Sequence, residues 1–118
     1  MTLHTSHTMR ETSLLLYFPE YENINFSEKI RNKVHLEIIQ LLQINIQGMT
    51  DREMAEEKGY ADPNVIRPRR HELVYGTKKH PELAGILESA GERTCSVTHR
   101  KSIYWVLNKG KLYAYVGV

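Results

Sequence analysis

The spacing of apolar residues predicts a first helix over residues 28–43. Its apolar positions recur every three or four residues and share one face: Ile30, Val34, Ile38, Leu41 and Leu42. Ser27 precedes this pattern and is a residue type that favours the N-cap position. The alternation of apolar and polar residues over 44–47 then predicts a short strand.

A second, shorter helix is predicted over residues 51–58. Thr50 has the side chain of an N-cap residue, and Glu53 stands three positions later, which is the spacing of a capping box. In that motif the two residues satisfy each other's free backbone N–H groups. Gly59 suits the position just past the helix end, where the left-handed conformation is common.

A third helix is predicted over residues 62–75. Asp62 is a good N-cap, and Pro63 fits the first helical position, which needs no N–H partner. Pro68, however, lies within the predicted helix, where a proline removes a hydrogen bond and bends or breaks the helix. Two outcomes stay open: a helix bent at Pro68, or a separate turn over 63–66 before a helix that begins at Pro68.

The last part of the chain predicts a β-hairpin. Alternation is clearest where Ile103, Trp105 and Leu107 share one face of a strand, so Trp105 is expected in the core. Cys95 is the single cysteine, cannot form an internal disulfide, and is expected to be a small core residue. The predicted elements are a loop over 77–85, strands over 86–97 and 102–107 joined by a basic tip over 98–101, and one further strand over 112–116.

These elements follow the order helix, strand, helix, helix, strand, hairpin, strand. That order predicts an α+β fold with three helices and a small antiparallel sheet. With 118 residues, of which 41% are apolar, the chain fits one small domain. We expect this domain over 27–108, after an N-terminal tail and extension over 1–26 and before a C-terminal extension over 109–118.

Three stretches of the sequence resemble small winged-helix domains found in phage and other mobile-element proteins. They are Met49 to Ala55, Asp62 to Arg70 followed by Glu72-Leu73, and Gly91 to Thr98. The resemblance implies a winged helix-turn-helix that binds double-stranded DNA. Helix 62–75 would enter the major groove, and the wing, 97–102, would contact the backbone or the minor groove. No firm biochemical role goes with this resemblance, so the expected functions include both a transcriptional regulator and a replication accessory.

The charged residues are segregated along the chain. Lys and Arg number 16 and Asp and Glu 14, so the net charge is only +2, which alone does not indicate nucleic acid. Basic residues gather over 67–80 and again over 99–101, whereas acidic residues gather over 11–28 and 51–57. The two basic runs therefore fall on the predicted third helix with the loop after it, and on the hairpin tip.

The candidate DNA-binding residues lie on these elements. They are Asn64, Arg67, Arg69, Arg70, His71, Lys78, Arg100 and Lys101. Arginine forms paired hydrogen bonds with guanine and asparagine with adenine, so Asn64 and Arg67 are the candidates for base contacts. Arg100 and Lys101 are candidates for contacts with phosphates or the minor groove.

Two alternatives concern these same residues. A helix that begins at Pro68 would make Arg70, His71 and Lys78 the stronger candidates for DNA contact. The arginines can instead pair with acidic residues of the second helix, among them Asp51. In that case their charge would be used within the protein and would not reach DNA.

The apolar ends of the chain, 14–18 and 112–118, favour a second hypothesis, in which the scaffold docks a protein partner or forms a homodimer. No enzyme, cofactor or metal is predicted, because structural zinc needs four closely spaced ligands and Cys95 with His99 does not supply them. The chain has no apolar run of about 20 residues and no secretory signal, so we expect a cytoplasmic protein.

Overall fold

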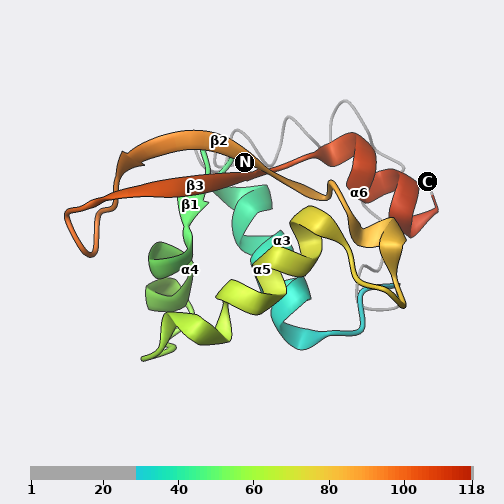
Figure 1. The fold of residues 1–118 in the computed structure, drawn as a ribbon, viewed down its shortest axis with the longest axis horizontal. Coiled ribbons are helices and arrows are strands. Elements are labelled where there is room, and N and C mark those ends of the chain that lie inside the picture. The colour runs from blue at the N-terminus through green and yellow to red at the C-terminus, as the bar shows by residue number, and fades with distance from the viewer. Residues whose placement is uncertain (1–28, 118) are drawn as a thin grey trace, which may run out of the picture.

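The computed structural model describes residues 29–117 and has an α+β architecture (Figure 1). Within these residues, four α-helices accompany one three-stranded antiparallel sheet. The elements are α3 (Lys33–Ile44), β1 (Met49–Thr50), α4 (Asp51–Glu57), α5 (Arg67–Tyr75), β2 (Leu87–Thr94), β3 (Lys101–Leu107) and α6 (Lys109–Val116), with the short 3-10 helices η2 (Pro63–Val65) and η3 (Pro81–Leu83). No helix in this part of the chain is long and apolar enough to cross a membrane.

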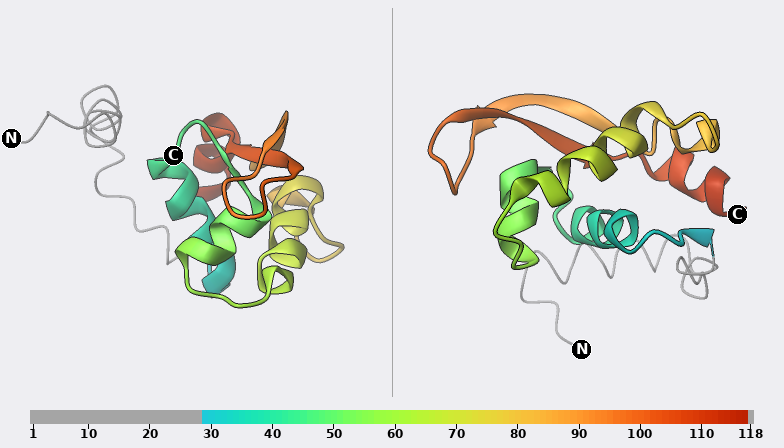
Figure 2. Two further views of the ribbon diagram at one scale, coloured as in Figure 1. Left: turned by 90° about the vertical axis from the view of Figure 1, so that its left-hand side faces the viewer. Right: turned by 60° about the horizontal axis from the view of Figure 1, so that its bottom comes forward.

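The strands β2 and β3 form a long hairpin that runs along one side of the molecule (Figures 1 and 2). The helices α3, α4 and α5 lie on the other side, and the hairpin tip extends past α4. The sheet order is β1-β3-β2, with Met49 opposite Trp105 and Leu87 opposite Leu107. The pairing of β2 with β3 is interrupted by a bulge at Ala90, between Ser89 and Gly91.

The core lies between the hairpin and the helices. Side chains with less than 2% exposure come from every layer and include Ile38, Ile39, Leu42, Met54, Ile66, Leu73, Ile86, Leu87 and Leu112. Trp105 is 6% exposed and Cys95 is fully buried, so both predictions of core residues are confirmed. Ile66 and Leu73 fix α5 against this core, since burial of one such side chain stabilises a fold by about 2 kcal/mol.

The capping box at the start of α4 is confirmed. Thr50 N–H donates to Glu53 Oε1 at 2.9 Å, and Glu53 N–H donates to Thr50 Oγ1 at 3.2 Å. The helix ends at Glu57, with Lys58 as C-cap, and Gly59 takes a φ of +75° just beyond it. The short range of these contacts explains why the sequence alone located this helix.

The first predicted helix and strand need correction. The helix begins at Lys33 because Asn32 caps it, accepting hydrogen bonds from two backbone N–H groups at 2.9 and 3.1 Å. The predicted cap, Ser27, lies outside the described residues. The helix continues through Ile44, so the strand predicted over 44–47 is wrong. The chain reverses at Gly48, with a φ of +97°, and the strand follows at Met49–Thr50.

The predicted third helix is two separate elements. Asp62 caps the 3-10 helix η2 by accepting from Asn64 N–H at 2.9 Å, and α5 begins at Arg67. Pro68 therefore stands in the first turn of α5, where its missing N–H leaves no bond unmade. A single continuous helix over 62–75 is thus wrong, and the alternative of a turn followed by a new helix is close to the observed structure.

The predicted strand over 112–116 is also wrong, because this segment forms α6. Asn108 caps the helix by accepting from Lys111 N–H at 3.1 Å. Leu112, Tyr113 and Val116 are all buried, and their spacing places them on one face of a helix. The segment after the hairpin therefore packs its apolar residues into the core of the same fold.

Candidate nucleic-acid interface

A cavity of about 460 Å³ lies between the start of α5 and the β2–β3 hairpin. Four cationic residues line it, namely Arg52, Arg67, Arg70 and Lys101, together with the acidic residues Asp51 and Glu92. Arg67 belongs to α5 and Lys101 to the hairpin, so the two basic runs of the sequence meet here. In space the cavity joins segments that the sequence separates by some thirty residues.

Arg70 is held inside this cavity by Asp51. Its Nε donates to Asp51 Oδ1 at 3.0 Å and its Nη2 to Asp51 Oδ2 at 2.8 Å. The guanidinium also lies over the ring of Trp105, 4.2 Å from the centroid, and both charged side chains are 12% exposed. Arg70 thus ties α5 to α4 and the sheet, as in the alternative in which the arginines pair with acidic residues of the second helix.

Arg67 is much more accessible than Arg70. Its side chain is 56% exposed, and its Nε lies 3.7 Å from Asp51 Oδ2, a looser contact than that of Arg70. Its Nη1 donates to Asn64 Oδ1 at 3.1 Å, so the two predicted base-contacting residues touch each other. Exposed contacts of this kind contribute about 0.5 kcal/mol, so the side chain can exchange them for another anion at little cost.

The other predicted residues are distributed over three places. Lys101 and Arg100 are exposed on the hairpin, and His71 is exposed on α5 with its ring 4.6 Å from that of Tyr75. Arg69 pairs with Glu72 at 3.1 Å and faces a different cavity, which Lys78 also lines. The structure therefore does not bring Lys78 to the cavity beside the hairpin.

Arg52 was missed in the sequence because it stands within an acidic run. It lies in the first turn of α4, directly after Asp51, and its side chain lines the cavity. Its Nε is buried and has no hydrogen-bond partner among the described residues. The usable signal was its position two residues after the N-cap Thr50, on the helix that precedes α5.

The hairpin is fastened to α4 by the carboxylate of Glu53. Oε1 accepts from Arg93 Nη2 at 2.7 Å, in addition to the capping contact with Thr50. Oε2 accepts from both the backbone N–H and the hydroxyl of Ser96, each at 2.9 Å. Arg93 Nη2 also donates to the carbonyl of Gly48 at 2.8 Å, and its guanidinium lies 4.8 Å from the Tyr104 ring centroid.

This network keeps Glu53 charged. Burial raises the pKa of the carboxyl group, but hydrogen bonds from the backbone of Ser96 and Thr50, then from the Ser96 hydroxyl and Arg93, outweigh burial and lower it to about 2. In the sequence Glu53 is recognisable only as part of the capping box, since nothing local indicates its contacts with residues some forty positions later.

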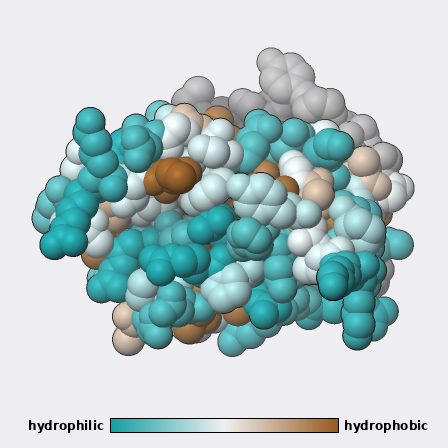
Figure 3. All heavy atoms as spheres, in the orientation of Figure 1, coloured by the Kyte–Doolittle hydropathy of each residue, from teal (hydrophilic) through white to brown (hydrophobic). Residues whose placement is uncertain are grey.

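The face that carries the cavity is largely hydrophilic, with one compact hydrophobic patch visible beside the hairpin (Figure 3). Ile103 lines the cavity and is 45% exposed, and Tyr75 on α5 is 65% exposed. A mixture of cations with a few exposed apolar and aromatic groups suits the mixed chemistry of a nucleic-acid groove.

Within residues 29–117, no cluster of three or more His, Cys, Asp or Glu side chains is placed to hold a metal ion. No protein-family model matches the chain, and neither a curated protein nor a solved structure is detectably similar to it.

Proposed function

We propose that this chain contains a winged helix that binds double-stranded DNA. In this assignment α4, η2 and α5 are the helix-turn-helix, α5 is the recognition helix, and the β2–β3 hairpin is the wing. Support comes from the element order α3, β1, α4, α5, β2, β3 and from the sheet order β1-β3-β2, which places the hairpin beside the two helices.

The observation that carries the proposal is the convergence of Arg52, Arg67 and Lys101 on one cavity. They come from three separate elements, α4, α5 and β3, and none of them is needed to fill the core. Cations that converge on one concave face produce the positive potential that attracts a phosphate backbone. An α-helix fits the major groove, and recognition helices contact base edges through their N-terminal residues. Arg67 is the first residue of α5.

The proposed roles follow from exposure. Arg67 and Asn64 contact base edges, and His71 lies further along the same side of α5. Arg52, Arg100 and Lys101 contact phosphates or the minor groove. Arg70 is a positioning residue, because its guanidinium is hydrogen-bonded to Asp51 and stacked on Trp105. A DNA-binding module of this kind would serve either the regulation of transcription or an accessory role in replication.

The competing proposal is a module that docks a protein partner or a second copy through the same face. The exposed side chains of Tyr75 and Ile103 favour it. The apolar residues of α6 do not, because Leu112, Tyr113 and Val116 are already buried in the core of this chain.

Fluorescence anisotropy with a labelled pool of random duplexes distinguishes the two proposals. We expect binding at about 50 mM salt that weakens steeply towards about 200 mM, as phosphate contacts are screened. The double variant Arg67→Ala/Lys101→Ala should bind at least about tenfold more weakly and with a shallower salt dependence. The charge-matched control Lys33→Ala/Lys111→Ala removes two exposed lysines away from the cavity and should bind normally.

No binding to any duplex at low salt would reject DNA binding. Sequencing of the bound duplexes then separates base recognition from backbone binding. A winged helix that reads bases through Asn64 and Arg67 enriches a defined motif, and Arg67→Ala relaxes the preference at one or two positions.

A further inference from the structure

A second cavity, of about 620 Å³, lies at the other end of α5. Its lining comes from the segment before α3 and the first turn of α3, from α5, from η3 and the loop before it, and from α6. The cationic residues that line it are Lys29, Arg31, Arg69, Lys78 and Lys79, and the described lining contains one acidic residue, Glu72. Its volume lies within the range of about 300–1,000 Å³ found for small-molecule sites.

Glu72 does not neutralise this cavity. Its Oε1 is already shared between Arg69 Nη1 at 3.1 Å and His35 Nε2 at 2.8 Å. Burial lowers the pKa of His35 despite the raising effect of Glu72, which favours the neutral imidazole. The positive charge of the site therefore comes from the lysines and arginines and does not depend on this histidine.

Four cations of the cavity are available to an anion. Lys29, Arg31, Lys78 and Lys79 are exposed and form no ion pair with any other residue in 29–117. Four neighbouring like charges repel one another, and a cleft lined by one sign of charge concentrates oppositely charged ligands. Lysine and arginine are the side chains that bind phosphate groups, and four of them match more than one phosphate.

Part of the cavity lining is apolar. It includes Ile30 and Leu83, which are 3% and 5% exposed, and the half-buried Tyr115. Such side chains offer contact to the flat or aliphatic body of an organic ligand, whereas inorganic anions do not use them. Small-molecule sites combine this kind of apolar lining with a few charged groups that orient the ligand.

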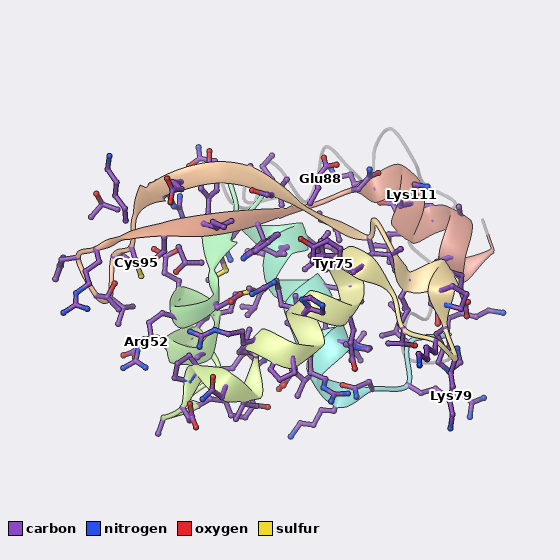
Figure 4. All side chains as sticks on the ribbon, in the orientation of Figure 1. Arg52, Tyr75, Lys79, Glu88, Cys95 and Lys111 are labelled. Atoms are coloured by element: carbon purple, nitrogen blue, oxygen red, sulfur yellow. The ribbon has the colours of Figure 1, made fainter. Side chains whose placement is uncertain are left out.

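The second cavity is separate from the proposed DNA interface. Figure 4 shows Lys79 at one end of the molecule, and Arg52 and Cys95 near the hairpin tip at the other end. We infer that the cavity lined by Lys29, Arg31, Lys78 and Lys79 binds a nucleoside diphosphate, with the phosphates on the cations and the nucleoside over Ile30, Leu83 and Tyr115. This inference is independent of DNA binding.

Isothermal titration calorimetry with ADP, CDP, GDP and UDP tests the site at about 50 mM salt. We expect at least one of them to bind with a stoichiometry of one. Lys78→Ala/Lys79→Ala should weaken that binding at least about tenfold, while the control Lys33→Ala/Lys111→Ala leaves it unchanged. Thermal unfolding checks that both variants fold.

Two further ligands test the cationic residues and the apolar residues of the site one at a time. Pyrophosphate and the matching nucleoside should each bind at least about tenfold more weakly than the diphosphate. The inference is overturned if none of the four diphosphates binds, if pyrophosphate binds as tightly as they do, or if the control variant loses binding equally. It is also overturned if Lys78→Ala/Lys79→Ala weakens duplex binding as much as Arg67→Ala/Lys101→Ala, since the cavity would then be a DNA phosphate contact.

Discussion

Both carboxylate oxygens of Asp51 accept hydrogen bonds from Arg70, from Nε at 3.0 Å and from Nη2 at 2.8 Å. The Trp105 ring packs against the guanidinium of the same arginine. The pair connects the first turn of α4 to α5, and each of the two side chains is only 12% exposed. It therefore fixes the angle at which α5 projects from the protein.

Replacement of Asp51 by alanine should destabilise the fold by about 3 kcal/mol, because Arg70 would remain buried without a counterion. Urea unfolding at pH 7 measures the loss. Arg67→Ala is the matched control: its exposed contact with the same carboxylate should contribute less than about 1 kcal/mol. Equal losses from the two substitutions would contradict the difference in burial.

The stability of the protein should depend on the ionisation of Glu53. Its pKa is about 2 in the folded chain against an ordinary value of 4.5, so the unfolded chain takes up the proton first as the pH falls. The stabilisation is complete above about pH 5 and is lost between pH 4.5 and about 2, with a total of about 3 kcal/mol.

The unfolding free energy of Glu53→Gln should therefore change less between pH 6 and about pH 3 than that of the original protein, by roughly 2 kcal/mol. Glu57→Gln, an exposed change in the same helix, is the control and should keep the original pH dependence. Identical pH dependence of the original protein and Glu53→Gln would show that another group controls stability in this range.

Gly48 should tolerate no side chain. It has a φ of +97°, and an added Cβ would lie 2.7 Å from the Trp105 carbonyl oxygen and 2.8 Å from a Tyr104 ring carbon. Gly48→Ala should thus destabilise the fold by about 3 kcal/mol, through backbone strain and a clash with β3. Gly59→Ala has similar backbone strain, with a φ of +75°, but open space around it, and should cost about 1 kcal/mol in thermal or urea unfolding.

Leu112 of α6 should contribute to stability as a core residue. It is fully buried, and Leu112→Ala is expected to lose about 3 kcal/mol of unfolding free energy. Lys111→Ala, next to it but exposed, should change stability by less than about 0.5 kcal/mol. If Leu112→Ala were as mild as the control, α6 would not be part of the core.

Local signals predicted the fold well where a few neighbouring residues determine the structure. The capping box of Thr50 and Glu53 acts over three positions, and the alternation around Trp105 marks a strand directly. The segment 112–116 was wrongly predicted as a strand, because a short apolar run fits a strand or a buried helix equally. What decided for a helix was burial of Leu112 and Val116 against the rest of the chain, a tertiary effect.

The candidate site was predictable in composition but not in arrangement. The basic runs indicated α5 and the hairpin, and the structure brings Arg67 and Lys101 to one cavity. Arg67 is exposed and Arg70 is buried because Arg70 pairs with Asp51, a residue 19 positions earlier in the sequence. Lys78 was grouped with the other cations because it is close in sequence, yet α5 carries the chain to the other end of the molecule.

The carboxylate of Glu53 takes part in two structures at once, since it closes the cap of α4 and receives the hairpin through Ser96 and Arg93. Displacement of this one side chain would break hydrogen bonds in both structures. The start of α4 and the turn end of the hairpin are therefore expected to open as one cooperative unit. In native-state hydrogen exchange, the amides of Thr50 and Ser96 should open with the same free energy.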